Sequence, residues 1–151
     1  MKTSRKAIEA FLESKKLAIA GASRDPKKFG HVVFTDLKKK GFELYPVNPG
    51  IDFIDGQPCF HSVRALPADV RHLLIVTPKI KTLEIVKEAI EKGINNIWIQ
   101  QMSDTTEALD YLKDKQVNLI NKECILMWAD PVSGFHKFHK TIKKIFGALP
   151  K

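Results

Sequence analysis

Short apolar runs alternate along this chain with segments whose hydrophobic residues recur at helical spacing. Fully apolar or nearly apolar runs, which predict buried strands, cover residues 17–21, 42–47, 73–76, 97–99 and 117–120. Segments with helical spacing lie between them at residues 29–40, 81–92 and 105–115. Strands that alternate with helices in this way predict a parallel sheet with helices on both faces.

The ends of these elements are marked by capping and turn residues. Ser4 can cap a first helix that runs to about residue 15, and a last helix is expected from about residue 135. Gly41 and Gly93 are placed to end two of the helices. Asp55-Gly56 predicts a turn before a short edge strand at 58–60, and Pro46 should stop strand pairing near that position. In the helix over 29–40, the residues expected to point inward are Val32, Val33 and Leu37.

The predicted fold is therefore a three-layer, Rossmann-like α/β domain. Its sheet should have five or six mostly parallel strands, and a single domain should span residues 1–151. In such a sheet, ligands bind outside the carboxyl ends of the strands, where the strand order reverses. The segments that follow each strand are thus the ones that should carry the chemistry.

Charge narrows the choice of partner. The chain carries 25 basic and 17 acidic residues, a net charge of +8, which favours anionic ligands. The lysines form short clusters rather than a dense stripe with interleaved aromatic residues, so nucleic acid is not the expected partner. No apolar run approaches the roughly 18 residues that span a bilayer, and the basic N-terminus continues as an amphipathic segment. A cytoplasmic protein is expected, with its two cysteines, Cys59 and Cys124, reduced.

The loop after the first strand, residues 21–30 (GASRDPKKFG), combines the sequence features of a phosphate-binding site. Small residues at 21–23 let the backbone approach a phosphate closely, and Arg24, Lys27 and Lys28 add positive charge. The loop also opens a helix, whose first N–H groups are free for an anion. The alternative is an ordinary strand-to-helix turn with solvated lysines.

The dinucleotide fingerprint is absent from this loop. A GxGxxG motif that starts at Gly21 would need glycines where Ser23 and Pro26 stand. The acidic residue that binds a ribose at the end of the second strand is also missing, because that segment is Val47-Asn48-Pro49. NAD and ATP are therefore disfavoured as ligands.

Four motifs together resemble the CoA-binding domain family, which is related to the N-terminal domain of the succinyl-CoA synthetase alpha subunit. They are residues 21–26 (GASRDP), 28–30 (KFG), 45–49 (YPVNP) and 97–100 (IWIQ), in the order and spacing of the family. The resemblance runs from about residue 17 to residue 124. One departure is that relatives commonly have Pro-Gly where this chain has Gln101-Met102, and the larger Met102 would narrow the pantetheine end.

The resemblance implies a ligand and a role for each motif. The ligand would be coenzyme A or an acyl-CoA. Its pyrophosphate would be held by the first loop and the helix entry, which comprise Gly21, Ala22, Ser23, Arg24, Lys28, Phe29 and Gly30. Asn48 and Pro49 would sit beside the adenosine, and the pantetheine arm would be lined by Thr77, Pro78, Gln100 and Gln101. The synthetase's phosphohistidine belongs to a domain outside the resemblance, so its activity does not carry over.

The most consistent function is thus a CoA-binding module without catalytic activity of its own. An NAD(P)-dependent or other nucleotide-binding enzyme on the same fold is the alternative, and a basic interaction protein is a third. Cys124 follows the last strand, so it is either a buried thiol or a residue near the ligand's thiol that forms a mixed disulfide in preference to Cys59. His136 and His139 lie one helical turn apart, but two histidines without a third ligand make a poor metal site, and no metal is expected.

Overall fold

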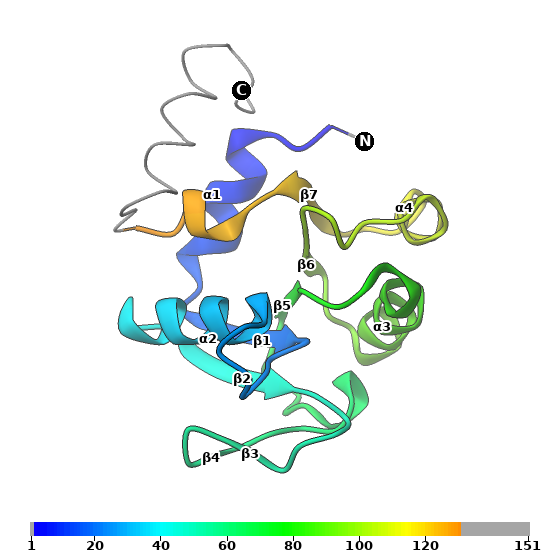
Figure 1. The fold of residues 1–151 in the computed structure, drawn as a ribbon. Helices are drawn as coiled ribbons and strands as arrows, with labels where there is room; N and C mark the ends of the chain where they lie inside the picture. Colours follow the sequence, from blue (N-terminus) through cyan, green and yellow to red (C-terminus); the bar gives the residue numbers. More distant parts are fainter. Residues whose placement is uncertain (1, 131–151) are drawn as a thin grey trace.

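The computed structural model describes residues 2–130, and these form a parallel sheet between two layers of helices (Figure 1). The five strands of this sheet are β1 (Lys16–Ala20), β2 (Glu43–Val47), β5 (His72–Ile75), β6 (Asn96–Gln100) and β7 (Asn118–Glu123). Their order is β2-β1-β5-β6-β7, and every neighbouring pair is parallel. The α/β Rossmann-like fold expected from the sequence is confirmed.

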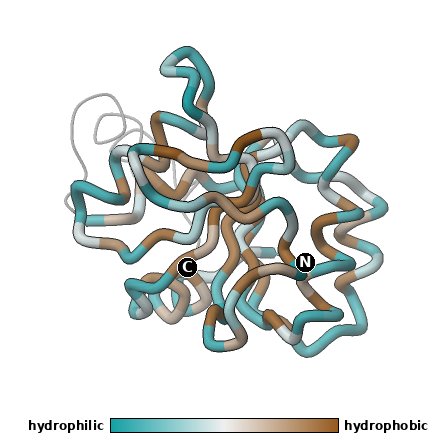
Figure 2. Tube along the Cα trace, turned by 90° about the horizontal axis from the view of Figure 1, so that it is seen from below, coloured by the Kyte–Doolittle hydropathy of each residue, from teal (hydrophilic) through white to brown (hydrophobic). Residues whose placement is uncertain are grey.

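The helices divide between the two faces of the sheet (Figure 1). One face carries α1 (Arg5–Glu13), α2 (Phe29–Lys39) and the short 3₁₀ turn η2 (Ile125–Met127). The other carries α3 (Lys79–Lys92), α4 (Thr106–Leu112) and the 3₁₀ turn η1 (Val63–Ala65). Each face has its own apolar core, one around Phe11, Phe34 and Trp98 and the other around Val86 and Ile97. Figure 2 shows the apolar segments gathered in the central strands.

The helix caps follow the expectations from the sequence. Oγ of Ser4 accepts a hydrogen bond from the N–H of Ala7 at 3.1 Å, which starts α1. Beyond α2, the N–H of Gly41 donates to Lys38 and the N–H of Phe42 donates to Leu37, so Gly41 ends this helix with a positive φ of 83°. Gly93 ends α3 in the same left-handed conformation.

One expectation for α2 is wrong. Val32 was expected to point inward, but it is 42% exposed, whereas Phe34 is fully buried beside Val33 and Leu37. A helix turns about 100° per residue, so the buried stripe is the one that also includes Gly30 and Leu37, one turn apart from Val33 and Phe34. Val32 lies on the side of the helix opposite to that stripe. Hydrophobicity alone did not place it.

The edge of the sheet beside β2 differs in detail from the prediction. The expected turn at Asp55-Gly56 joins β3 (Phe53–Ile54) to β4 (Gln57–Pro58), with positive φ at both turn residues. The edge strand expected at 58–60 is thus shorter and belongs to a separate hairpin. Phe60 pairs with Val47 as an isolated parallel bridge, and its N–H donates to the carbonyl of Pro46. Pro46 faces this outer edge, so its missing N–H removes no bond between β1 and β2.

Two expectations concern parts of the chain that the structure describes only in part or not at all. Within residues 2–130 there is no helix long and apolar enough to cross a membrane. The last helix expected from residue 135, with His136 and His139, lies outside the described residues.

The stability of the fold should depend on the ionisation of His72 at the start of β5. The imidazole packs edge-on against Phe11, with ring centroids 5.2 Å apart, and burial lowers the pKa of His72 below its ordinary value of 6.5. The fold therefore favours the neutral ring, and the unfolded chain takes up a proton first as pH falls. This contribution is complete above pH 6.5 and is lost as pH falls towards the lower pKa of the folded state.

We expect urea unfolding to show less stability at about pH 5 than at about pH 7.5, with a shallower loss for His72→Gln. Identical pH slopes for the two proteins would show that His72 does not contribute to the acid sensitivity.

Candidate functional site

A cleft opens where the strand order reverses. After β1 the chain moves to β2 on one side, and later returns to β5 on the other side of β1, so the carboxyl ends of β1 and β5 flank the switch point. The cleft has a volume of about 720 Å³. It is lined from the β1–α2 loop, the end of β2, the segment 61–63, the segment between β5 and α3, and the first three turns of α3. This is the position expected for the ligand of an open parallel sheet.

Two glycines bring the backbone of the β1–α2 loop close to its neighbours. Gly21 has a positive φ of 97°, and a Cβ there would lie 3.0 Å from the carbonyl carbon and oxygen of Val76. A Cβ on Gly30 would lie 1.9 Å from the carbonyl oxygen of Gly21. The first turn of α2 therefore packs directly on the end of β1. The expectation that Gly21 is small for the ligand's sake is incomplete, because the protein's own backbone already requires glycine there.

The side chain of Asn48 ties the loops after β1 and β2 together. Its Nδ2 donates to the carbonyl oxygen of Ala22 at 2.8 Å, and its Oδ1 accepts from the N–H of Gly50 at 2.8 Å. Both polar atoms of the amide are thus engaged within the protein. Asn48 lies in the cleft lining, as expected beside an adenosine, but its hydrogen bonds shape the loops that form the cleft wall.

The N-terminus of α2 is open to the cleft. Lys28 is the N-cap residue, and no side chain caps the first N–H groups of the helix. Lys28, Phe29 and Gly30 all line the cleft. A helix start without a side-chain cap, next to a lysine, is a favourable place for a phosphate. His31 supports the loop from behind, because its Nδ1 lies 3.1 Å from the carbonyl oxygen of Ser23.

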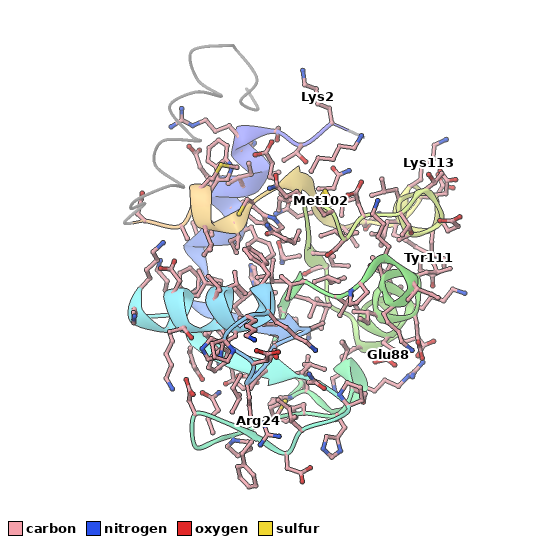
Figure 3. All side chains as sticks on the ribbon, in the orientation of Figure 1. Lys2, Arg24, Glu88, Met102, Tyr111 and Lys113 are labelled. Carbon is pink, nitrogen blue, oxygen red and sulfur yellow. The ribbon has the colours of Figure 1, made fainter. Side chains whose placement is uncertain are left out.

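Most of the residues singled out from the sequence meet in this cleft. The lining includes Gly21, Ser23, Lys28, Phe29, Gly30, Asn48, Pro49, Thr77 and Pro78. Four others lie outside the lining, namely Ala22, Arg24, Gln100 and Gln101. Arg24 is exposed near β2, at the opposite end of the sheet from Met102 (Figure 3).

The side chains at the end of β6 and in the turn after it do not line the cleft. Gln100 is 3% exposed, and its Oε1 accepts from the N–H of Ile125 at 3.2 Å, so its side chain is committed to the packing of η2. Met102 has a positive φ of 75°, a conformation that favours glycine, and it is 79% exposed. A glycine would adopt this backbone conformation without strain. The Met102 side chain points away from the protein surface instead of narrowing the cleft described here.

Sequence reasoning missed one wall of the cleft. Lys81, Glu84, Ile85 and Glu88 line it from α3, and their spacing of three, one and three residues is that of a single helical face. The spacing of these residues along one helical face can be read from the sequence. It does not indicate a ligand site, because the helices of such folds usually pack on the sheet and are not expected to line a cleft. His61, Ser62 and Val63 were missed because they follow the hairpin and not a strand of the main sheet.

Glu88 fixes this wall to the segment 61–63. Its Oε2 accepts from the N–H of Val63 at 3.0 Å, and its Oε1 accepts from Nη1 of Arg64 at 2.9 Å. Glu88 is 8% exposed, and it lies between α3 and η1 (Figure 3). The buried carboxylate is therefore satisfied by a backbone donor and a guanidinium.

An unpaired hydroxyl group lies at the switch point. Oγ1 of Thr77 is buried and has no hydrogen-bond partner within residues 2–130, although Thr77 lines the cleft. Leaving a buried hydroxyl unpaired costs about 1–3 kcal/mol, so such an atom marks a place where a ligand or water completes the structure. Thr77 and the start of α2 thus both border this cleft. Within residues 2–130 the Thr77 hydroxyl is unpaired and the start of α2 has no side-chain cap.

Neither cysteine lines the cleft. Cys124 is 3% exposed and belongs to the apolar core on the α1–α2 face. Burial raises the pKa of the Cys59 thiol above its ordinary value, which keeps it protonated. The mixed disulfide of Cys124 with the ligand stays a prediction, and the burial of this thiol favours the alternative of a quiet core residue.

Fold and cleft together define a Rossmann-like α/β domain with a ligand site at the switch point of its sheet. The chain belongs to the CoA binding domain family, which matches residues 15–130. The alpha subunit of the ADP-forming acetate–CoA ligase II of Pyrococcus furiosus is 36% identical over 93 residues, which is 61% of this chain and 20% of that subunit.

Two solved structures are similar in fold. A conserved hypothetical protein from Pyrococcus furiosus has a TM-score of 0.71 and 40% identity, covering 73% of this chain and 95% of that one. A hypothetical protein from Pyrococcus horikoshii OT3 has a TM-score of 0.76 and 26% identity, covering 89% of this chain and all 100% of that one. The chain spans a fifth or less of the length of the ligases that it matches, so their activity is not established for it.

The close packing at the cleft floor predicts a large cost for a single methyl group. Gly30→Ala should lower the free energy of unfolding by about 3 kcal/mol or more, because its Cβ overlaps the carbonyl of Gly21. Gly41→Ala is the control for the added methyl group alone. No atom lies within 4 Å of its Cβ, and only the strain of the positive φ of 83° is expected, at about 1 kcal/mol. Urea denaturation of both variants measures the difference. Equal losses would mean that the α2–β1 contact relaxes without cost.

Proposed function

We propose that this chain binds coenzyme A in the cleft between the β1–α2 loop and α3. The observation that carries the proposal is the placement of nine of the thirteen residues suggested by the family resemblance around one cleft at the switch point. Membership of the CoA binding domain family names the ligand class. The residues present fit this ligand, because they offer cationic, polar and apolar groups along a single cleft.

The pyrophosphate is assigned to the start of α2. Lys28 and the uncapped N–H groups of this helix supply charge and donors, and the small residues Gly21 and Gly30 keep side chains out of the way. Ser23 adds a hydroxyl to the same wall, although its Oγ already accepts from the N–H of Asp25 at 3.1 Å. The net charge of +8 favours the approach of an anionic ligand.

The two ends of the ligand are assigned by the order of the strands. The adenosine is assigned to the β2 side, where Val47, Asn48 and Pro49 line the cleft. The pantetheine arm is assigned to the β5 side, where Thr77 has an unpaired hydroxyl and Pro78 forms the entry to α3. Gln100 and Gln101 are not assigned to the ligand, because Gln100 holds η2 and neither lines the cleft.

We further propose that this domain binds its ligand without catalysing a reaction by itself. The ligases that it resembles are much longer than the matching segment, so the segment corresponds to their CoA-binding part. An NAD(P)-dependent enzyme is the second candidate. It is disfavoured because GxGxxG is absent and because Asn48, in place of the ribose-binding acid, has both polar atoms engaged.

Ligand choice is tested by thermal stabilisation. CoA at about 100 times its Kd should stabilise the folded chain by about 2.7 kcal/mol, and NADH at the same concentration should stabilise it less. The shift in Tm is measured in matched titrations. Equal or greater stabilisation by NADH would contradict the proposal, and native mass spectrometry would show any CoA that copurifies with the protein.

The pyrophosphate assignment is tested at the start of α2. Lys28→Ala should weaken CoA binding about two- to fivefold, because the charge is partly exposed and screened by salt. Lys39→Ala, at the exposed far end of the same helix, is the control and should leave the Kd unchanged. Calorimetric titration gives both values. A loss in the Lys39 variant equal to that in the Lys28 variant would indicate a general charge effect and not a phosphate contact.

A further inference from the structure

We propose that His61 forms a separate subsite for a phosphomonoester on the ribose of the bound nucleotide. For CoA this group is the 3′-phosphate of the adenosine. The inference rests on the proposed function in so far as CoA is the ligand. It adds a residue that the family motifs do not include, on a segment outside the main sheet.

The basic side chains around the cleft are spaced along its length. Lys28, His61 and Lys81 are the three that line it within residues 2–130. Lys28 stands at the start of α2, where the pyrophosphate is assigned, and Lys81 is in the first turn of α3, beyond β5. His61 is the remaining one, and it comes from the segment beside β2. CoA likewise carries its third phosphate apart from the pyrophosphate, on the adenosine.

The backbone places His61 at the adenosine end of the cleft. Its neighbour Phe60 is bridged to Val47 at the end of β2, and the carbonyl of Phe60 accepts from the N–H of Asn48 at 2.8 Å. His61 therefore follows directly from a residue that is bonded to the β2 loop. In Rossmann-type folds the ribose lies at the end of the second strand, and a basic residue near that position accommodates a ribose phosphate.

A second contact restrains the imidazole of His61. Its Nε2 lies 2.8 Å from Oδ1 of Asp52, which precedes β3, and this leaves Nδ1 without a partner in the described part of the chain. The His61 side chain is 60% exposed, so a ligand can reach it. Restraint through one ring nitrogen lowers the entropy that is lost when the other binds an anion.

The other charged side chains near this end of the cleft do not offer a free cation to a phosphate. Arg64 is three residues further on, but its guanidinium is paired with Glu88 and Glu91 at 2.9 and 2.8 Å. Glu84 also lines the cleft, on α3 one turn before Glu88. Among the cleft-lining residues at this end, His61 is the basic group available.

Calorimetric titration of the full chain with CoA and with 3′-dephospho-CoA tests this subsite. The wild type should prefer CoA by about five- to tenfold, and the preference should shrink as salt is added. His61→Gln should reduce the preference to less than about twofold, while His61→Lys, which keeps a basic side chain at this position, should retain it. Lys81→Gln is the matched control, because it removes a cation from the other end and should weaken both ligands equally.

The outcomes separate this inference from the proposed function. If the wild type binds CoA but does not discriminate against 3′-dephospho-CoA, or if His61→Gln retains the full preference, the subsite is wrong and CoA binding stands. If CoA does not bind, NADP⁺ and NAD⁺ provide the second comparison, since they too differ by one ribose phosphate. A preference for NADP⁺ that His61→Gln removes would support the subsite while contradicting CoA as the ligand. With no preference in either pair, both proposals fail.

Discussion

The contact between the start of α2 and the end of β1 is the constraint on which the rest of the site depends. Gly30 rests on the carbonyl of Gly21, at a separation that leaves no room for a Cβ. This contact brings the uncapped N-terminus of α2 to the switch point, and it sets the path of the residues between. Gly21 in turn lies against the backbone of Val76 and the methyl group of Thr77, directly after β5, so β1, α2 and the segment after β5 meet closely at this point. Any larger residue would move the helix away from the cleft.

The remaining walls are held by polar contacts that act between segments distant in sequence. Asn48 joins the β1 and β2 loops, and Glu88 joins α3 to the segment 61–63. Both use their side chains on backbone groups, which is how buried amides and carboxylates are usually satisfied. The cleft is therefore preformed, and within residues 2–130 the hydroxyl of Thr77 is unpaired and the start of α2 has no side-chain cap. A preformed site loses less entropy when its ligand binds.

Much of this could be predicted from the sequence, for reasons that differ between elements. The buried strands were evident because runs such as residues 73–76 are apolar on both faces, as strands covered on both sides must be. Helix ends were evident where Gly41 and Gly93 adopt the left-handed conformation. The loop after β1 was a candidate phosphate site because its small and basic residues are contiguous. Burial of Val32 was wrongly expected, because two adjacent valines look alike in a sequence while only one faces the sheet.

The sequence by itself determined the alternation of strands and helices, the parallel sheet and the loop after β1, since each depends on residues that are neighbours along the chain. Only the tertiary structure decided which side chains share the cleft. It placed Gln100 under η2, pointed Met102 outward and added the α3 face. It also brought His61 beside the end of β2 through the bridge between Phe60 and Val47. These relations depend on strand order and on contacts between distant segments, and a single sequence carries no local signal for either.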